Sequence, residues 1–172
     1  MCFILSVTYT QSWIMSNNNI NYVKWDMNRT LTDNYSAHLG KNAKETHHRY
    51  VLGLYRICEG IINGFPDVFF EGCASGGCRF DPAMLYFAPQ GWTSDDTDPI
   101  ERLTIQFGTS MCYPTSTMGA HVSASRRAGY ETKMNVALWG SFGYELDVTT
   151  MSDEDKEAVK GQIAEYHKYY DL

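Results

Sequence analysis

The chain has 172 residues and a formal net charge of -6, with 14 lysines and arginines against 20 aspartates and glutamates. This length favours a single domain and is too short for a closed eight-stranded α/β barrel, which typically needs about 250 residues. The acidic balance argues against a nucleic-acid partner, since an electrostatic binder of nucleic acid carries a basic face. Because 20% of the residues are charged and 14% are aromatic, a folded chain is expected rather than a disordered one.

Residues 1–19 show neither a clean alternation nor a helical period, and they form an atypical N-terminal segment. The apolar run at the start of this segment has no basic region before it and no cleavage site after it. It is therefore a poor signal peptide, and it is too short to span a bilayer. No membrane association is expected, and the cytoplasm is the expected location.

After this segment, apolar or aromatic-rich stretches that end in polar or small residues predict buried strands. They are Ile20–Asp26, Asp67–Gly72, Gly91–Asp95, Met118–Ala124 and Gly143–Val148. Helical patterns lie between them, and strands that alternate with helices in this way are typical of βα units with a parallel sheet. No linker or change of composition divides the chain, so residues 1–172 predict a single α/β domain.

Helices are predicted between and after these strands. Arg49–Ile62 carries apolar residues along one face at helical spacing. Another helix begins after Asp98, which is the expected N-cap, with Glu101 reaching back toward it. The last helix follows Ser152, and its expected apolar face consists of Ala158, Val159, Ile163 and Tyr166.

The chain contains five cysteines at spacings that match no disulfide framework, so reduced thiols are expected. Cys73 and Cys78 lie close together in a glycine-rich stretch, but no histidine or cysteine pair elsewhere completes a zinc set. No metal is therefore expected.

The end of the first predicted strand carries a cation and a carboxylate. In a parallel α/β sheet, functional side chains project from the carboxyl ends of the strands and from the loops that follow. Because side chains alternate along a strand, Lys24 and Asp26 are expected on one face and Trp25 on the other. A nearby positive charge favours the ionised form of a carboxylate, so this pattern suits an aspartate that is kept ionised.

Unusual residues also follow the next two predicted strands. Cys73, Ser75 and Gly76 belong to a glycine-rich turn, and glycine lets backbone N–H groups approach a ligand closely. Trp92 precedes a run of acidic residues that begins at Asp95, directly before a predicted helix. The glycine turn does not predict a phosphate site, because the lysine and hydroxyl residue that open the helix of such a loop are missing.

Asp26 and Asp95 lie about two βα units apart, so we expect them to face the same mouth of the sheet. Two carboxylates across a pocket that is lined by a tryptophan suit glycoside hydrolysis, in which one is the nucleophile or base and the other the proton donor. The pattern also allows a structural role, and Asp98 is expected to be a helix cap only. His47 and His121 have no nucleophile beside them in the sequence and are expected to be packing or surface residues.

Long contiguous motifs cover much of residues 20–172. They read YVKWDMNR (Tyr22–Arg29), HRYVLGLY (His48–Tyr55) and FEGCASGGCRFDPAMLYFAPQGWTSDDTD (Phe70–Asp98), and then IERLTIQFGTS and YPTSTMGAHVSA. These motifs resemble the catalytic half of the glycoside hydrolase family 36 α-galactosidases.

The resemblance implies a retaining hydrolase on a (β/α)8 barrel that removes terminal α-linked galactose from melibiose- and raffinose-type sugars. It implies that Asp26 is the nucleophile and Asp95 the acid/base, with Asp95 protonated at rest, Asp26 ionised and about 5–5.5 Å between the carboxyl groups. Neither a metal nor an organic cofactor is required. The positions that match the galactose pocket are Lys24, Cys73, Ser75, Gly76, Trp92 and Asp96.

Members of this family are several hundred residues longer, so the chain is expected to be a fragment. The expected fold is a partial (β/α)8 barrel, roughly the C-terminal half with about five parallel strands. A half-sheet of this kind leaves an edge and an apolar face uncovered, so weak or no activity and some association are expected of the chain alone. A full-length member could form an oligomer. The alternatives are an inactive remnant with at most carbohydrate binding, or an α-N-acetylgalactosaminidase or galactosyl transferase activity.

Overall fold

The computed structural model describes residues 10–28, 32 and 35–170 of the chain. All described strand pairs are parallel, in a three-stranded and a two-stranded sheet. The first sheet has the order β1 (Tyr22–Asp26), β2 (Phe69–Cys73) and β3 (Gln90–Gly91), and the second pairs β4 (Gly119–Ser123) with β5 (Ser141–Glu145). An isolated bridge between Gly91 and Met118 connects the two sheets. The predicted α/β fold with parallel strands is therefore confirmed.

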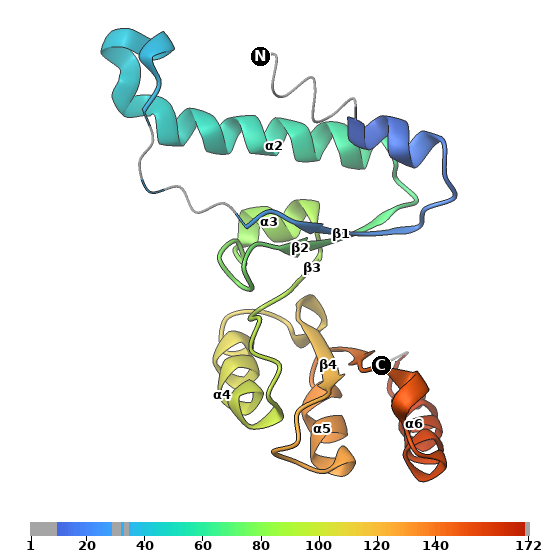
Figure 1. Ribbon diagram of the computed structural model, residues 1–172. Coiled ribbons are helices and arrows are strands. Elements are labelled where there is room, and N and C mark those ends of the chain that lie inside the picture. Colours follow the sequence, from blue (N-terminus) through green and yellow to red (C-terminus); the bar gives the residue numbers. More distant parts are fainter. Residues whose placement is uncertain (1–9, 29–31, 33–34, 171–172) are drawn as a thin grey trace.

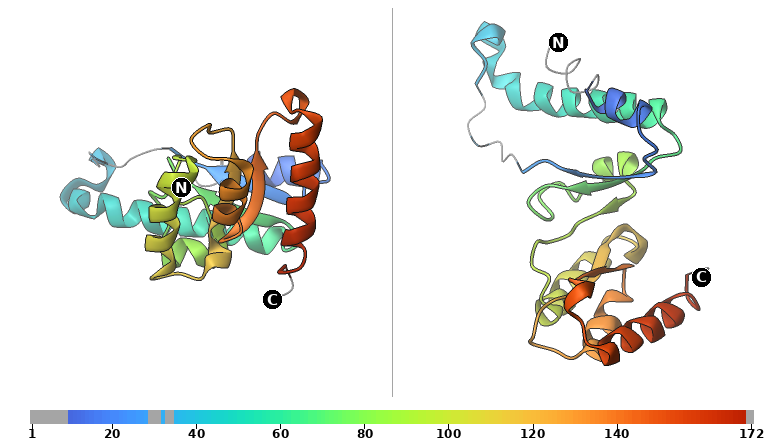
Figure 2. Two further views of the ribbon diagram at one scale, coloured as in Figure 1. Left: turned by 90° about the horizontal axis from the view of Figure 1, so that it is seen from below. Right: turned by 45° about the vertical axis from the view of Figure 1, so that its right-hand side comes forward.

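Helices connect these strands. They are, in chain order, η1 (Ala37–Glu45), α2 (Thr46–Gly64), α3 (Pro82–Phe87), α4 (Pro99–Ser110), η2 (Thr115–Thr117), α5 (Tyr130–Ala137), η3 (Val148–Thr150) and α6 (Asp153–Tyr166). Residues 10–16, in the segment for which the sequence predicts no clear element, are also helical. Figure 1 shows α2 along one side of the first sheet, while α4, α5 and α6 gather around β4 and β5 in the other half of the molecule. The same two halves are visible in the turned views of Figure 2.

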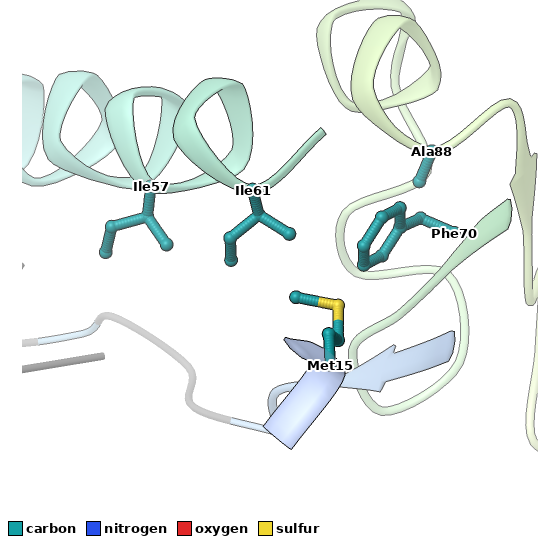
Figure 3. Packing of buried hydrophobic residues seen from close by; sticks show 5 residues of the cluster. All are labelled: Met15, Ile57, Ile61, Phe70 and Ala88. Atoms are coloured by element: carbon teal, nitrogen blue, oxygen red, sulfur yellow. The ribbon is translucent and has the colours of Figure 1, made fainter. Parts of the chain in front are cut away.

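The core of the first half lies between α2 and the three-stranded sheet. Figure 3 shows side chains from both sides meeting there, and the buried cluster consists of Met15, Ile57, Ile61, Phe70 and Ala88. Val23 and Trp25 of β1 pack against this cluster. Alternate residues of a strand point to opposite faces, so Tyr22 and Lys24 of β1 and Glu71 of β2 lie on the other face of the sheet. We call this other face the polar face.

All five predicted strands are present with shifted bounds, and two of them differ most from the observed ones. The strand expected at Gly91–Asp95 ends at Gly91, because the carbonyl groups of Ser94 and Asp96 accept hydrogen bonds from a side chain of α4 instead of from a neighbouring strand. The strand expected to begin at Gly143 begins at Ser141, whose N–H donates to the carbonyl of Met118.

The predicted starts of α4 and α6 are confirmed, whereas the helix predicted at Arg49–Ile62 spans Thr46–Gly64. Some side-chain contacts of the helices also differ. The Asp98 carboxylate caps α4 by accepting from the N–H groups of Ile100 and Glu101, and Ser152 caps α6. Glu101 does not reach back toward the cap, because its carboxylate pairs with Arg127 at 2.9 Å.

The packed face of α6 matches the predicted apolar face only in part, because Val159 and Tyr166 are half-buried whereas Ala158 and Ile163 are exposed. Ile163 is 40% exposed, whereas Gln162 is buried. Gln162 accepts a hydrogen bond from the Tyr144 hydroxyl and donates to the carbonyl of Tyr130. Gln162 therefore connects α6 to Tyr144 of β5 and to Tyr130 of α5 through hydrogen bonds.

In the described part of the chain, no helix is long and apolar enough to cross a membrane. The described cysteines are free thiols, with Cys58 and Cys73 buried and Cys78 and Cys112 exposed. Cys2 and the apolar run at residues 1–9 lie outside the described residues.

Candidate active site

Asp26 is the last residue of β1, and the parallel register places it beside Cys73, the last residue of β2. Its carboxylate accepts a hydrogen bond of 3.1 Å from the side-chain amide of Asn28. Burial raises the pKa of the Cys73 thiol, and the neighbouring Asp26 carboxylate raises it further. The carboxyl ends of β1 and β2 thus bring the predicted nucleophile and a predicted pocket residue side by side.

Lys24 pairs with a carboxylate that the sequence analysis does not identify. Its ammonium group lies 3.3 Å from an oxygen of Glu71, so the expected partnership with Asp26 is replaced by one across the strands. Glu71 is buried on the polar face, where it also accepts hydrogen bonds from the Tyr22 hydroxyl and, at 2.9 Å, from the side-chain amide of Gln90. Burial and the adjacent Glu71 carboxylate both raise the pKa of Tyr22.

The glycine turn after β2 joins the first two strand ends to the loop after β3. Ser75 has a positive φ of 48° and its N–H donates to the side-chain oxygen of Asn28 at 2.7 Å. Gly76 has a φ of 71°, and a Cβ atom there would lie 2.8 Å from the backbone nitrogen of Asp95. A Cβ atom on Gly77 would likewise collide with the carbonyl oxygen of Thr93. The glycines are therefore needed for close packing of the two loops, a reason different from the predicted approach to a ligand.

Trp92 lies at the centre of a group of charged and aromatic side chains. It is 5% exposed. The Lys24 ammonium lies 4.2 Å from the centre of its ring, and the guanidinium carbon of Arg102 lies 4.4 Å from it. The His121 ring is 4.7 Å away, and burial lowers the pKa of this histidine. Cations at such distances are attracted to the electron-rich faces of indole. His121 is thus a packing residue against the tryptophan, as predicted.

The acidic run after Trp92 contains two carboxylates with different surroundings. Asp96 accepts a hydrogen bond from the N–H of Asp98 at 3.0 Å and is therefore engaged within its own turn. Asp95 is exposed, and no hydrogen bond or ion pair from another described residue holds its carboxylate. Asp96 is exposed as well, but one of its carboxylate oxygens is used within the turn.

Asn28, Glu71 and Arg102 belong to this region and are missed by the sequence analysis. Glu71 and Arg102 are charged residues among apolar neighbours in a predicted strand and a predicted helix, and this signal could have marked them as buried and functional. Asn28 stands two residues after Asp26, but nothing in the spacing shows its contact with Ser75. Among the described residues, no group of three histidine, cysteine or acidic side chains is arranged to hold a metal ion.

The sequence profile of the melibiase family matches residues 4–172. The chain belongs to the melibiase family. The match includes most of the segment at residues 1–19, and it confirms the resemblance to glycoside hydrolase family 36.

Curated relatives in this family are α-galactosidases. The chain is 50% identical to alpha-galactosidase AgaA of Geobacillus stearothermophilus over 164 residues. This alignment covers 91% of this chain and 22% of that protein. It is 48% identical to an alpha-galactosidase of Lactobacillus acidophilus over 162 residues, and this alignment covers 90% of this chain and 22% of that protein. The chain thus spans about a fifth of the length of these relatives.

Solved structures of the melibiase family are also similar to this chain. The alpha-galactosidase of Lactobacillus brevis superposes with a TM-score of 0.95 at 45% identity, over 98% of this chain and 24% of that one. A variant of AgaA in complex with raffinose superposes with a TM-score of 0.93 at 47% identity, over 96% of this chain and 24% of that one.

Proposed function

We propose that this chain carries the catalytic carboxylates of an α-galactosidase, with Asp26 as the nucleophile and Asp95 as the acid/base, on strands that form part of a (β/α)8 barrel. The proposed substrates are terminal α-galactosides of the melibiose and raffinose type. Relatives in the family are named alpha-galactosidases, and a similar structure holds raffinose.

The observation that carries the proposal is that one short turn contacts both the strand end that bears Asp26 and the loop that bears Asp95. Asn28 binds the Asp26 carboxylate and accepts from the N–H of Ser75, while the next residue, Gly76, packs on the backbone of Asp95. Because β1, β2 and β3 are parallel, their carboxyl ends meet at one edge of the sheet. Paired carboxylates at such an edge suit glycoside hydrolysis.

In the proposed reaction, the Asp26 carboxylate attacks the anomeric carbon and forms a covalent galactosyl-enzyme, while Asp95 donates its proton to the departing glycosidic oxygen. Asp95 then removes a proton from water, whose oxygen attacks the anomeric carbon and releases galactose and the Asp26 carboxylate. Two displacements at the same carbon retain its configuration. The remaining proposed pocket residues are Lys24, Cys73, Ser75, Gly76, Trp92 and Asp96.

Covalent labelling tests this proposal on the chain itself. A mechanism-based galactosyl epoxide or a 2-fluoro-galactosyl fluoride should add to the peptide that contains Asp26, as read by mass spectrometry. The variant D26N should remain unlabelled, whereas D67N should be labelled like the wild type, because Asp67 precedes β2 at its amino end. A folded wild-type sample that takes up no label would leave the chain with at most carbohydrate binding.

A further inference from the structure

Arg102 is a buried cation in the second turn of α4 that does not use its charge in an ordinary ion pair. It is 2% exposed. None of the salt bridges among the described residues includes it. A charged group that is removed from water is destabilising unless its hydrogen-bonding capacity is satisfied, so its partners show what the residue is for.

Most of those partners lie on both sides of Asp95, and Nη1 also donates to the carbonyl of Gly119 in β4 at 3.4 Å. The Nε of Arg102 donates to the carbonyl of Asp96 at 2.7 Å, and Nη2 donates to the carbonyl of Ser94 at 2.7 Å. Nη1 donates to the Thr93 hydroxyl at 2.8 Å. The guanidinium also stacks on Trp92, the residue at which this loop leaves the sheet.

We propose that Arg102 is a positioning residue, which holds the Thr93–Asp96 loop so that the Asp95 carboxylate can protonate the leaving group. This inference rests on the proposed role of Asp95. The planar guanidinium is suited to the task because it directs several N–H groups at once from a rigid fork, which the ammonium group of a lysine cannot do.

The choice of acceptors fits a proton donor. A direct ion pair between Arg102 and Asp95 would favour the ionised carboxylate, which cannot donate a proton. The hydrogen bonds go instead to neutral oxygens of the flanking residues, so they fix the backbone. The guanidinium forms no direct ion pair with the Asp95 carboxylate and interacts with it only electrostatically, from beyond ion-pair distance. The rigid helix α4, which begins three residues after Asp95 at its cap Asp98, anchors the guanidinium.

The decisive experiment compares leaving groups in the wild-type chain and in the variants R102K and R102M. Dinitrophenol leaves without a proton, whereas the sugar of raffinose needs one. We expect R102M to lose about a hundredfold or more in raffinose hydrolysis, the usual contribution of a general acid, and less than about tenfold with dinitrophenyl α-galactoside. R102K should lie between. R56M, on the exposed side of α2, should match the wild type. Equal losses on both substrates in R102M would overturn the proposal.

Amide hydrogen exchange supplies a readout that does not depend on turnover. The N–H groups of Asp96 and Asp98 are bonded within the loop, to Ser94 and Asp96. Their exchange should become at least about tenfold faster in R102M, while that of the Trp92 N–H, bonded to Gly72, stays unchanged. Unchanged exchange at Asp96 and Asp98 would overturn the positioning role. A wild-type chain that hydrolyses neither substrate leaves the role of Arg102 to the exchange data, which decide by themselves whether Arg102 holds the loop, since weak or no activity is expected of the chain alone.

Discussion

The ammonium group of Lys24 and the carboxylate of Glu71 form an ion pair of 3.3 Å across neighbouring strands, in which Lys24 is 37% exposed and Glu71 is 1% exposed. The pair lies on the polar face of the sheet, below the strand ends that carry Asp26 and Cys73. The Lys24 ammonium also lies 4.2 Å from the centre of the Trp92 ring, so the lysine contacts the carboxylate and the indole at once.

Replacing Glu71 by glutamine should destabilise the fold. The E71Q side chain keeps the shape but removes the charge that pairs with Lys24, and it leaves one amide N–H₂ group to find an acceptor. We expect a loss of about 1 to 3 kcal/mol in the free energy of unfolding, as measured with urea. E59Q on the exposed side of α2 is the matched control and should change the value by less than about 0.5 kcal/mol. A wild-type midpoint for E71Q would show that the pair contributes nothing.

Replacing Gly76 by alanine should separate the two loops of the site. The positive φ of 71° is unfavourable for alanine, and its Cβ would press on the backbone of Asp95. We expect a loss of at least about 1 to 2 kcal/mol in the free energy of unfolding and reduced labelling of Asp26. G161A is the control, because a Cβ at Gly161 in α6 meets nothing within 4 Å. That variant should gain about 0.5 to 1 kcal/mol, and a similar gain in G76A would contradict the loop contact.

The stability of the chain should fall in alkali, in part because of Cys58. Burial raises the pKa of this thiol from 9.0 to about 11. A raised pKa means that the folded state holds the proton more tightly. The contribution of the protonated Cys58 thiol to the free energy of unfolding is therefore complete below pH 9 and is lost as the pH rises toward 11. Urea midpoints measured from pH 8 to 11 should decrease, and the decrease should be shallower in C58A than in C112A, whose thiol is exposed. Parallel slopes in the two variants would exclude Cys58 as a source.

Removing the cap of α4 should weaken the support of the Asp95 loop. The Asp98 carboxylate accepts from the N–H groups of Ile100 and Glu101 and from the Ser125 hydroxyl at 2.8 Å. D98A should therefore unfold at a lower urea concentration than the wild type. D153A, in the first turn of α6 with a fully exposed side chain, should show the smaller effect. The reverse order of the two midpoints would contradict the capping role.

The parts of this structure that depend on local sequence could be predicted, and those that depend on partners far along the chain could not. Asp98 and Ser152 cap helices because their side chains bond to N–H groups two or three residues later, which the sequence displays directly. The early end of β3 depends on Arg102 of the following helix α4, whose side chain donates to the carbonyls of Ser94 and Asp96. The partner of Lys24 likewise comes from another strand, and period-two reasoning identifies only the face on which Lys24 lies.

The candidate site shows the same division between features that the local sequence predicts and features that depend on distant partners. The alternation of strands and helices predicts Asp26 at the end of β1 and places Asp95 near the end of β3, although Asp95 lies in the loop after that strand. Their roles as nucleophile and acid/base stay predictions. Asn28 was missed, because its link between Asp26 and Ser75 needs the turn in three dimensions.

The isolated bridge between Gly91 and Met118 has a consequence for the cooperativity of folding. Among the described strands, it is the one ladder contact between the two sheets, so backbone pairing couples the halves weakly. Trp92 adds side-chain coupling, since Lys24 approaches its ring from the first half and Arg102 and His121 approach from the second. Each half can then behave as a separate foldon, and the indole becomes the reporter of their separation, because solvent reaches its ring when the halves part.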